Sequence, residues 1–395
     1  MKDYVIEHKT RCAVCSTRLP APIITLKQLP ITGVFSKNPP LQKTKGIDQH
    51  FCLCRSCGHG QITRCLSPEY LYGQGYSFRT SQSESSKSGS DFFLSFLRSI
   101  TRNRKFNCIL DVGCNDLYLL KKLKNSAKRL IGIDPIWKNR KNGKGSSIES
   151  IGQSVENVDF DKLCPESADL IICRHTFEHI SQPRKVLQKL SSASGDKTLF
   201  VFEFPSLECL LEESRFDRIF HQHLQYFSLR SFLKLLNLTG AHHFDFIFNK
   251  KHWGALLIAF QKKSSVQRKQ LKFNKPAISS KKIQTEYNSF QRKFVACGER
   301  IKSFKNKNIY AYGATFMLPV IYYHLGISPE ELSIVFDDDK RKSGLSFANL
   351  AVRIYAPDFQ KIKESSIAIT ALDHVQSIKR KISPHNSQQI IMPLN

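Results

Sequence analysis

Two pairs of cysteines near the start of the chain place the strongest constraint on its fold. Cys12 and Cys15 form one Cys-x2-Cys pair, and Cys54 and Cys57 form a second. Each pair can turn tightly enough to aim both thiolates at one ion, and two pairs complete a tetrahedral zinc site. Cys52 could replace Cys54 as a ligand, but only Cys54 has the spacing of a pair. We therefore predict a structural zinc, because four thiolates leave no open position for a substrate.

Short apolar strands alternate with amphipathic helices after the cysteine-rich segment. We expect strands at 108–112, 130–133, 168–173, 198–204, 244–248 and 255–260, and helices at 118–123, 180–190 and 231–236. This alternation predicts a mostly parallel sheet with helices on both faces. A basic stretch at 262–282 indicates a linker, after which a helix and strands at 308–312, 332–336, 366–370 and 389–392 predict a second, smaller α/β sheet. The expected parts are a zinc-binding module at 1–75, an α/β domain at 76–265 and a C-terminal α/β domain at 283–395.

The composition restricts the partners of the chain only loosely. Its 60 Lys and Arg against 33 Asp and Glu give a formal net charge of +27 in 395 residues. Such an excess favours nucleic acid, an acidic membrane surface or a phosphorylated small molecule, although it can also reflect solvated faces. No stretch of about 18 apolar residues is free of charge, so we expect no membrane span, and with no apolar signal segment we expect a cytoplasmic protein.

The first strand of the central domain leads into a turn that favours a nucleoside cofactor. Ligands of open α/β sheets bind beyond the carboxyl ends of the strands, where a glycine lets the backbone come close and an acidic residue on the next strand accepts the ribose hydroxyls. The spaced glycines of a dinucleotide site are missing, which favours S-adenosylmethionine over NAD. The candidate cofactor-binding residues of this turn are Asp111, Gly113, Asn115, Asp116 and Asp134.

Several blocks along the chain together resemble one family, the three-domain, zinc-containing, S-adenosylmethionine-dependent sugar C-methyltransferases. The blocks are the four cysteines, 76–83, 111–116, 174–180, 203–206, 216–228, 312–314 and 336–344. The resemblance spans nearly the whole chain in the right order. It implies a central class I, Rossmann-like methyltransferase domain, a smaller Rossmann-like C-terminal domain that helps to hold a nucleotide-linked keto-deoxysugar, and zinc and S-adenosylmethionine as bound groups.

The resemblance also implies roles for particular side chains. In the family's chemistry a base removes the proton beside a ketone, and the enolate then attacks the methyl group of the cofactor. His223 is the implied base, with Tyr76, His221 and Gln222 as further candidates for the reaction. The residues expected near the cofactor at the next strand end are Arg174, His175, Glu178 and His179. A turn-bonded histidine remains the alternative for His223, and helix capping remains the alternative for Glu178 and His179.

Three positions depart from the family pattern. Gln222 stands where relatives carry Glu, Trp253 where they carry a small residue, and Leu117 where they carry Gly. If the backbone at Leu117 has a positive φ, the residue costs strain of about 1–3 kcal/mol. These departures favour a differently tuned reaction, a different sugar substrate or a homologue with weakened activity.

Other protein classes stay open beside the sugar methyltransferase. They are a nucleic-acid-binding protein or nucleic-acid methyltransferase, and a non-catalytic scaffold. We do not expect nucleic acid as the partner, because the second α/β domain suits a nucleotide-sugar, and we expect a monomer or homodimer.

Overall fold

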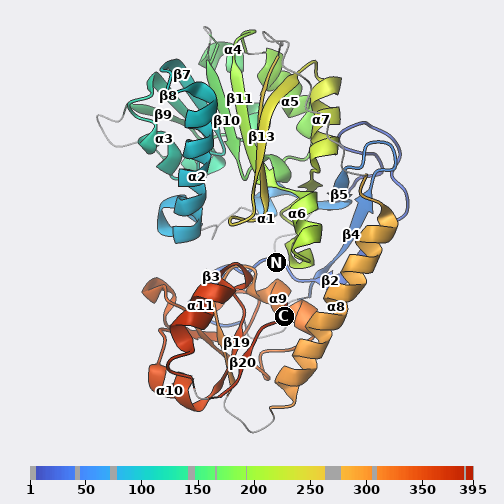
Figure 1. The fold of residues 1–395 in the computed structure, drawn as a ribbon, viewed down its shortest axis with the longest axis vertical. Helices are drawn as coiled ribbons and strands as arrows, with labels where there is room; N and C mark the ends of the chain where they lie inside the picture. Colours follow the sequence, from blue (N-terminus) through green and yellow to red (C-terminus); the bar gives the residue numbers. More distant parts are fainter. Residues whose placement is uncertain are drawn as a thin grey trace.

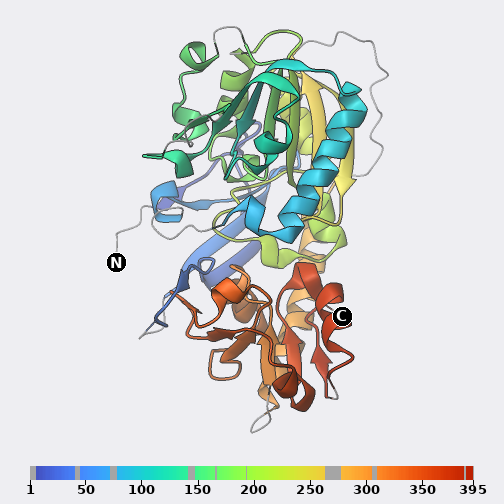
Figure 2. The same ribbon diagram turned by 90° about the vertical axis from the view of Figure 1, so that its left-hand side faces the viewer.

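The computed structural model describes residues 6–40, 45–71, 78–140, 147–164, 167–192, 194–262, 277–304, 309–386 and 388–394. The two largest sheets, each packed with helices, lie one above the other in Figure 1. The blue N-terminal strands lie between them in both ribbon views (Figures 1 and 2). Within these ranges, no helix combines the length and the apolar character that crossing a membrane requires.

The upper sheet has seven strands in the order β13-β14-β11-β10-β7-β8-β9. Their bounds are β7 (Phe106–Val112), β8 (Ala127–Ile133), β9 (Ile148–Ile151), β10 (Leu170–Arg174), β11 (Leu199–Pro205), β13 (His242–Asn249) and β14 (Ala255–Gln261). Strand β14 runs antiparallel to both of its neighbours, and the other pairs are parallel. The predicted mostly parallel sheet is therefore confirmed, and β9 is an addition that its short, mixed sequence did not reveal.

Helices cover both faces of the upper sheet. On one face α2 (Glu84–Thr101) and α3 (Tyr118–Lys122) bury Phe93 and Leu120 against alternate residues of the strands. On the other face lie α4 (Phe160–Leu163), α5 (Pro183–Ser192) and α7 (Leu229–Leu238), around a core rich in phenylalanine. The strands are buried on both sides, which explains why β10 and β11 are continuous apolar runs instead of alternating ones.

The N-terminal sheet contains a strand from the centre of the chain. Its order is β12-β5-β4-β2, with β2 (Ile24–Leu29), β4 (Ile47–Leu53), β5 (Gly60–Ile62) and β12 (Gln225–Tyr226). A short ribbon of β1 (Ile6–His8) and β6 (Arg64–Leu66) lies beside it, and α1 (Pro68–Leu71) follows. The N-terminal module is thus completed by residues that come about 160 positions later in the sequence than β5.

The lower sheet is parallel throughout, in the order β18-β16-β15-β19-β20. Its strands are β15 (Ile309–Tyr312), β16 (Ile334–Phe336), β18 (Arg353–Tyr355), β19 (Ser366–Ile369) and β20 (Ile390–Ile391). Its helices are α8 (Ser280–Lys302), α9 (Leu318–Leu325), α10 (Phe359–Glu364) and α11 (Val375–Ile382). Helix α8 begins before the expected boundary at 283, because the Ser279 side chain accepts from the Lys282 backbone and caps it.

The three parts share one continuous apolar core. It joins β2 and β4 to α6 (Leu207–Glu212), the turn η5 (Phe216–Arg218), α8, α9 and the lower sheet. Strand β3 (Phe35–Ser36) also pairs with β17 (Ser346–Phe347), and buried Arg215 and Arg218 both bind Asp373. The parts are therefore fixed to one another by packing, by strand pairing and by charge.

Candidate active site and zinc centre

The four predicted cysteines converge on one point. The Sγ atoms of Cys12 and Cys57 lie 3.6 Å apart, those of Cys15 and Cys54 lie 3.5 Å apart, and all four lie within 4.8 Å of one another. Tetrahedral zinc with Zn–S bonds of about 2.3 Å requires sulfur separations of about 3.8 Å, so the thiolates fit this ion. Cys52 is not part of the cluster, and its thiol contacts the carbonyl of Pro20 instead.

The turn after β7 is shaped for a close ligand. Gly113 has a φ of 79°, and a Cβ there would lie 1.8 Å from the hydroxyl of Thr176, so only glycine fits. Asp134, just beyond β8, accepts one hydrogen bond from the Asn115 amide at 2.9 Å and another from the Ile136 amide at 3.0 Å. A carboxylate offers about four acceptor positions, so Asp134 keeps capacity for two ribose hydroxyls.

The carboxyl groups of this turn are largely removed from solvent. Asp111 is buried, and burial raises its pKa to about 7, helped by the negative charge of Asp134 and opposed by Arg174. Burial also raises the pKa of Asp134. Because a cationic ligand would stabilise both carboxylates, the turn suits the positively charged S-adenosylmethionine.

Leu117 has a positive φ, which is the condition under which the sequence predicted backbone strain. Its φ of 63° and ψ of 18° are left-handed, and its side chain is buried against Gly132. A left-handed residue with a Cβ costs about 1–2 kcal/mol. Burying a leucine side chain contributes about 1.5–3 kcal/mol, so the packing of Leu117 offsets its backbone strain.

A short segment before α2 lies over this turn. The Thr80 and Ser81 amides donate to the side chains of Asn115 and Asp116, at 3.1 and 3.0 Å. Tyr76, a sequence candidate for the reaction, lies outside the described residues. The sequence did not indicate Trp137, whose indole N–H donates to the Asn115 carbonyl at 2.7 Å and closes the other side of the turn.

A buried cluster of histidines and carboxylates follows β10. The Nε2 atom of His175 lies 3.1 Å from Nδ1 of His252 and 3.8 Å from Glu203, and its Nδ1 lies 3.6 Å from Glu178. Burial disfavours the charged form of His175, but Glu178 and Glu203 outweigh this effect and raise its pKa to about 9. Burial and the charge on His175 lower the pKa of His252 to about 3. His175 is therefore the cation of this cluster, and His252 is neutral.

Arg174 is bound to protein groups in this structure. Its Nε donates to Glu203 at 2.5 Å, and its Nη1 donates to the hydroxyl of Ser90 at 2.9 Å. Burial would raise the pKa of Glu203, but Arg174 and His175 lower it to about 2. The expected role of Arg174 in cofactor binding stays a prediction, and its visible role is to hold Glu203 charged.

Glu178 is a carboxylate with unused capacity. It is 1% exposed, and neither oxygen has a hydrogen-bond partner among the described residues. His179 donates from Nδ1 to the Gln222 carbonyl at 2.6 Å, which turns its Nε2 toward Glu178, 3.9 Å away. Glu178, His179 and His223 bring their ligand atoms within 4.8 Å of one another. These positions exclude a capping role for the Glu178 side chain and point it into the site.

His223 lies beside this cluster and is nearly enclosed. Its ring is 5.0 Å from that of His179, 4.3 Å from Phe220 and 5.7 Å from Trp253, centroid to centroid. Burial, followed by the nearby charges of His179, His175 and Arg218, lowers its pKa well below 6.5. At neutral pH the ring is therefore uncharged and able to accept a proton.

The neighbours of His223 in the sequence contact the N-terminal part. His221 is buried, with Nδ1 3.1 Å from the Gln49 amide and Nε2 3.1 Å from the Leu29 carbonyl, and burial lowers its pKa to about 4. These contacts fix the loop, and its role in the reaction stays a prediction. The amide oxygen of Gln222 accepts from the hydroxyl of Thr32 at 3.1 Å.

Trp253 lies in the turn between β13 and β14 and contacts Phe316 of the C-terminal part. Its φ of 56° is left-handed, its indole stacks on Phe316 at 6.1 Å and 11°, and the Arg218 guanidinium lies 5.4 Å from the ring centre. The expectation that Trp253 changes the shape of the pocket stays a prediction.

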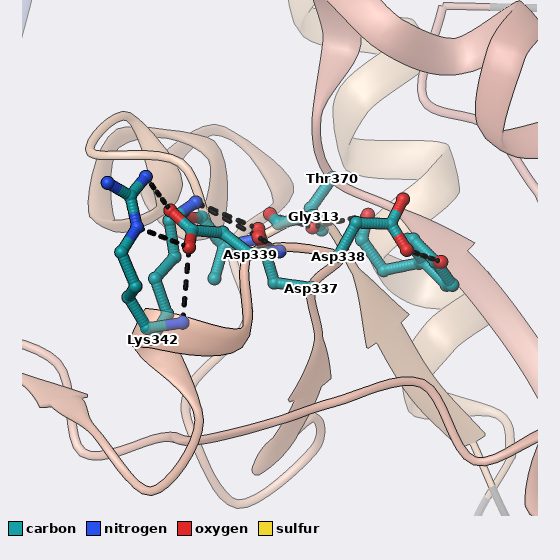
Figure 3. Close-up of polar contacts among 9 residues, drawn as sticks. Gly313, Asp337, Asp338, Asp339, Lys342 and Thr370 are labelled. Carbon is teal, nitrogen blue, oxygen red and sulfur yellow. Dashed lines mark hydrogen bonds and ion pairs between the residues drawn. The ribbon is translucent and has the colours of Figure 1, made fainter. Parts of the chain in front are cut away.

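A second turn of the same type lies at the carboxyl end of the lower sheet (Figure 3). Gly313 has a φ of 111°, and a Cβ on it would lie 2.3 Å from the Cβ of Ala371. The Thr370 hydroxyl donates to the Gly313 carbonyl at 2.9 Å, and Lys342 donates to both oxygens of Asp337 at 3.1 Å. This turn lies between β15 and β19, where the order of strands reverses and α/β sheets bind their ligands.

Comparisons with known proteins agree with this architecture. A family model described as "Methyltransferase domain" matches residues 90–242, and one described as "Putative zinc binding domain" matches residues 12–72. Together with the strand order and the four-cysteine cluster, these matches define the class: the chain is an S-adenosylmethionine-dependent methyltransferase with an N-terminal zinc-binding domain. It is similar to the C-methyltransferase NovU of Streptomyces niveus, with 21% identity over 323 residues, which cover 78% of this chain and 76% of NovU.

Two solved methyltransferase structures each match a little under half of the chain. The N-methyltransferase NodS of Bradyrhizobium japonicum WM9, in complex with S-adenosyl-L-homocysteine, matches with 14% identity and a TM-score of 0.36, over 49% of this chain and 95% of NodS. The 1,6-didemethyltoxoflavin-N1-methyltransferase of Burkholderia thailandensis matches with 12% identity and a TM-score of 0.33, over 45% of this chain and 78% of that one.

Proposed function

We propose that the protein transfers a methyl group to a carbon atom beside the ketone of a nucleotide-linked keto-deoxysugar. The observation that carries the proposal is His223, a buried, neutral imidazole beside a charged cluster that adjoins the cofactor turn through Gly113 and Thr176. A general base must be neutral and within reach of the proton that it removes. The similarity to NovU, which is described as a C-methyltransferase, supports the choice of carbon as the acceptor.

The residues around His223 have different roles in the proposed reaction. His223 takes the proton, and the negative charge that develops on the ketone oxygen is stabilised by the positive charges of His175 and Arg218 nearby. S-adenosylmethionine supplies the methyl group on its sulfonium. Glu178 stabilises the imidazolium that His223 becomes, and Phe220 and Trp253 keep water away from the enolate.

The lower sheet is the proposed holder of the nucleotide. Its turn at Gly313 and Thr370 lies at the reversal of strand order, and Phe316, a few residues further along the chain, packs on Trp253 in the active site. A substrate anchored at this turn would extend toward His223. The lysines and arginines of a chain with a net charge of +27 also favour a diphosphate.

A direct test incubates the protein with S-adenosylmethionine and a panel of nucleotide-linked ketosugars, and follows the gain of one methyl group by mass spectrometry. The variant His223→Gln should lower kcat by at least about 100-fold, the usual contribution of a general base, and should bind S-adenosyl-L-homocysteine normally. In deuterated water the native protein should exchange the proton beside the ketone without cofactor. Methylation of an oligonucleotide, or of oxygen or nitrogen, would contradict the proposal.

Gln222→Glu tests the tuning of the base. Gln222 precedes His223 in the chain, and the negative charge of Glu at this position would favour the charged form of His223 and raise its pKa. The native rate should stay constant as pH falls to about 6.5, because the pKa of His223 lies well below that value. In the variant the acidic decline should begin at a higher pH, and the plateau rate should be higher, because a more basic imidazole removes the proton faster. A lower rate with no shift of the pH profile would contradict a role for this position in tuning the base.

A further inference from the structure

We propose that the zinc-binding module positions the catalytic histidine, and that Gln225 and His59 are the positioning residues that connect the two. The inference rests on the proposed role of His223, and it assigns to the metal a mechanical effect on the active site without any contact with substrate.

The backbone makes the first connection. Strand β5 begins at Gly60, three residues after the ligand Cys57, and pairs with β12, which begins two residues after His223. The register places Gln225 opposite Gln61, and the Ile62 amide donates to the Leu224 carbonyl at 3.1 Å. The chain just after His223 is thus the edge strand of the sheet, paired with the strand that follows the second cysteine pair.

The Gln225 side chain makes the second connection. It is 4% exposed, its oxygen accepts from Nε2–H of His59 at 2.8 Å, and its amide donates to the Ile180 carbonyl at 2.9 Å. His59 lies two residues after Cys57, is fully buried and packs on Phe227 at 4.7 Å. One amide therefore joins the zinc knuckle to the segment that follows His179.

The two active-site segments are also joined directly. The Leu224 amide donates to the Glu178 carbonyl at 2.8 Å, and His179 donates to the Gln222 carbonyl at 2.6 Å. A displacement of β12 would therefore move Glu178 and His179 together with His223.

The position of His223 depends on this frame, because its own ring is weakly tethered. Within the described ranges, no hydrogen bond reaches its ring nitrogens, and the ring is held by packing on Phe220 and Trp253. Misplacement of a reacting group by about 1 Å can cost about 100-fold in rate. Cys57 would be fixed by a bound zinc, and through Cys57 so would His59 and β5, so loss of the metal should displace the base.

The test compares two buried glutamines that face each other across the β5–β12 pair. Gln225→Ala cuts the side-chain connection, whereas Gln61→Ala cuts bonds to the Ala13 amide at 2.8 Å and the Arg11 carbonyl at 3.3 Å, within the N-terminal module. Both variants should keep their zinc. Gln225→Ala should lower kcat by about 10-fold to 100-fold with an unchanged KM for the cofactor, and Gln61→Ala should stay within about threefold of the native kcat. Equal losses in the two variants, or no loss in Gln225→Ala, would overturn the proposal.

A second readout needs no substrate. Trp253 lies beside His223, and the chain has two tryptophans, so Trp137→Phe leaves Trp253 as the only fluorescent indole. In this background, removal of zinc by a chelator should shift the Trp253 emission, and added zinc should restore it. Gln225→Ala should give the same shift with zinc still bound, and Gln61→Ala should not.

The two readouts separate the two hypotheses. If no sugar is methylated but the emission responds as described, the proposed function fails and the coupling stands. An emission that ignores both zinc removal and Gln225→Ala would overturn the coupling, whatever the substrate.

Discussion

The upper and lower sheets build the same turn from different sequences. In the upper sheet the Gly113 amide donates to the Ile133 carbonyl at 2.7 Å, and in the lower sheet the Gly313 amide donates to the Phe336 carbonyl at the same distance. The carboxylate that follows the second strand then accepts from the amide of the first turn, Asp134 from Asn115 and Asp337 from Ala314.

The difference lies in what else touches the two carboxylates. Asp337 also accepts from the Asp339 amide at 2.9 Å and from Lys342 at both oxygens, so its acceptor positions are filled. Asp134 has two amide donors, and no lysine or arginine within the described residues forms an ion pair with it. The same backbone frame thus leaves one carboxylate open to a ribose and closes the other, so any nucleotide on the lower sheet must be held by other groups than Asp337.

Asp134 and Asp337 should differ most in what they contribute to cofactor affinity. Asp134→Asn should weaken S-adenosyl-L-homocysteine binding by about 100-fold, because charged hydrogen bonds to the ribose are lost. The matched variant Asp337→Asn should leave this affinity within about twofold. Calorimetric titration measures both, and equal effects would show that the comparison is wrong.

The next effect concerns stability. Lys342→Met leaves the carboxylate of Asp337 without its cation, and we expect the free energy of unfolding to fall by about 1.5–3 kcal/mol in urea titrations. Adding Asp337→Asn to this variant should restore most of the loss, because the uncompensated charge is then removed. A double variant as unstable as the single one would show that Lys342 acts through packing alone.

Leu117 is a further difference between the two turns, because residues 314–317 of the lower turn have no positive φ. Leu117→Ala loses the buried side chain and keeps the strain, so it should destabilise the protein by about 2–3 kcal/mol. Leu117→Gly loses the same packing but relieves the strain, and should recover about 1 kcal/mol of that loss. Thermal unfolding should rank the native protein as most stable, the glycine variant next and the alanine variant last. A glycine variant that is less stable than the alanine variant would contradict this balance.

The smallest effect is the response to acid. His252 has a folded pKa of about 3, below its unfolded value near 6.5, so the unfolded chain binds the proton first as pH falls. The stability that this group provides is complete above pH 6.5 and declines below it, by about 1 kcal/mol between pH 6.5 and 5.5. His252→Gln should reduce this slope in denaturant titrations at the two pH values, and an unchanged slope would assign the response to other groups.

The sequence predicted those features that depend on residues close together in the chain. The spacing of the cysteine pairs identified Cys54, and not Cys52, as the zinc ligand. The alternation of strands, turns and helices predicted both helix-covered sheets and the turn in which Leu117 is strained. Contacts between distant segments left no such pattern. The two residues of β12 are too short to read as a strand, and Trp137 enters the site only because the turn at Pro135 brings it back over Asn115. His221 belongs to the same motif as His223, but its ring is oriented by contacts with Gln49 and Leu29 of the N-terminal sheet.

The pairing of β3 with β17 has a consequence for how the chain is made. The Gly33 amide donates to the Phe316 carbonyl, and the Ala348 amide donates to the Val34 carbonyl, so the first forty residues find these partners some 300 positions later. At roughly 5–20 residues per second, a ribosome needs about 15–60 s to deliver them. During that time the cysteine module is already synthesised, yet the edge of β3 and the shared apolar core stay uncovered. A truncated chain that ends before the lower sheet should therefore aggregate even when zinc is plentiful.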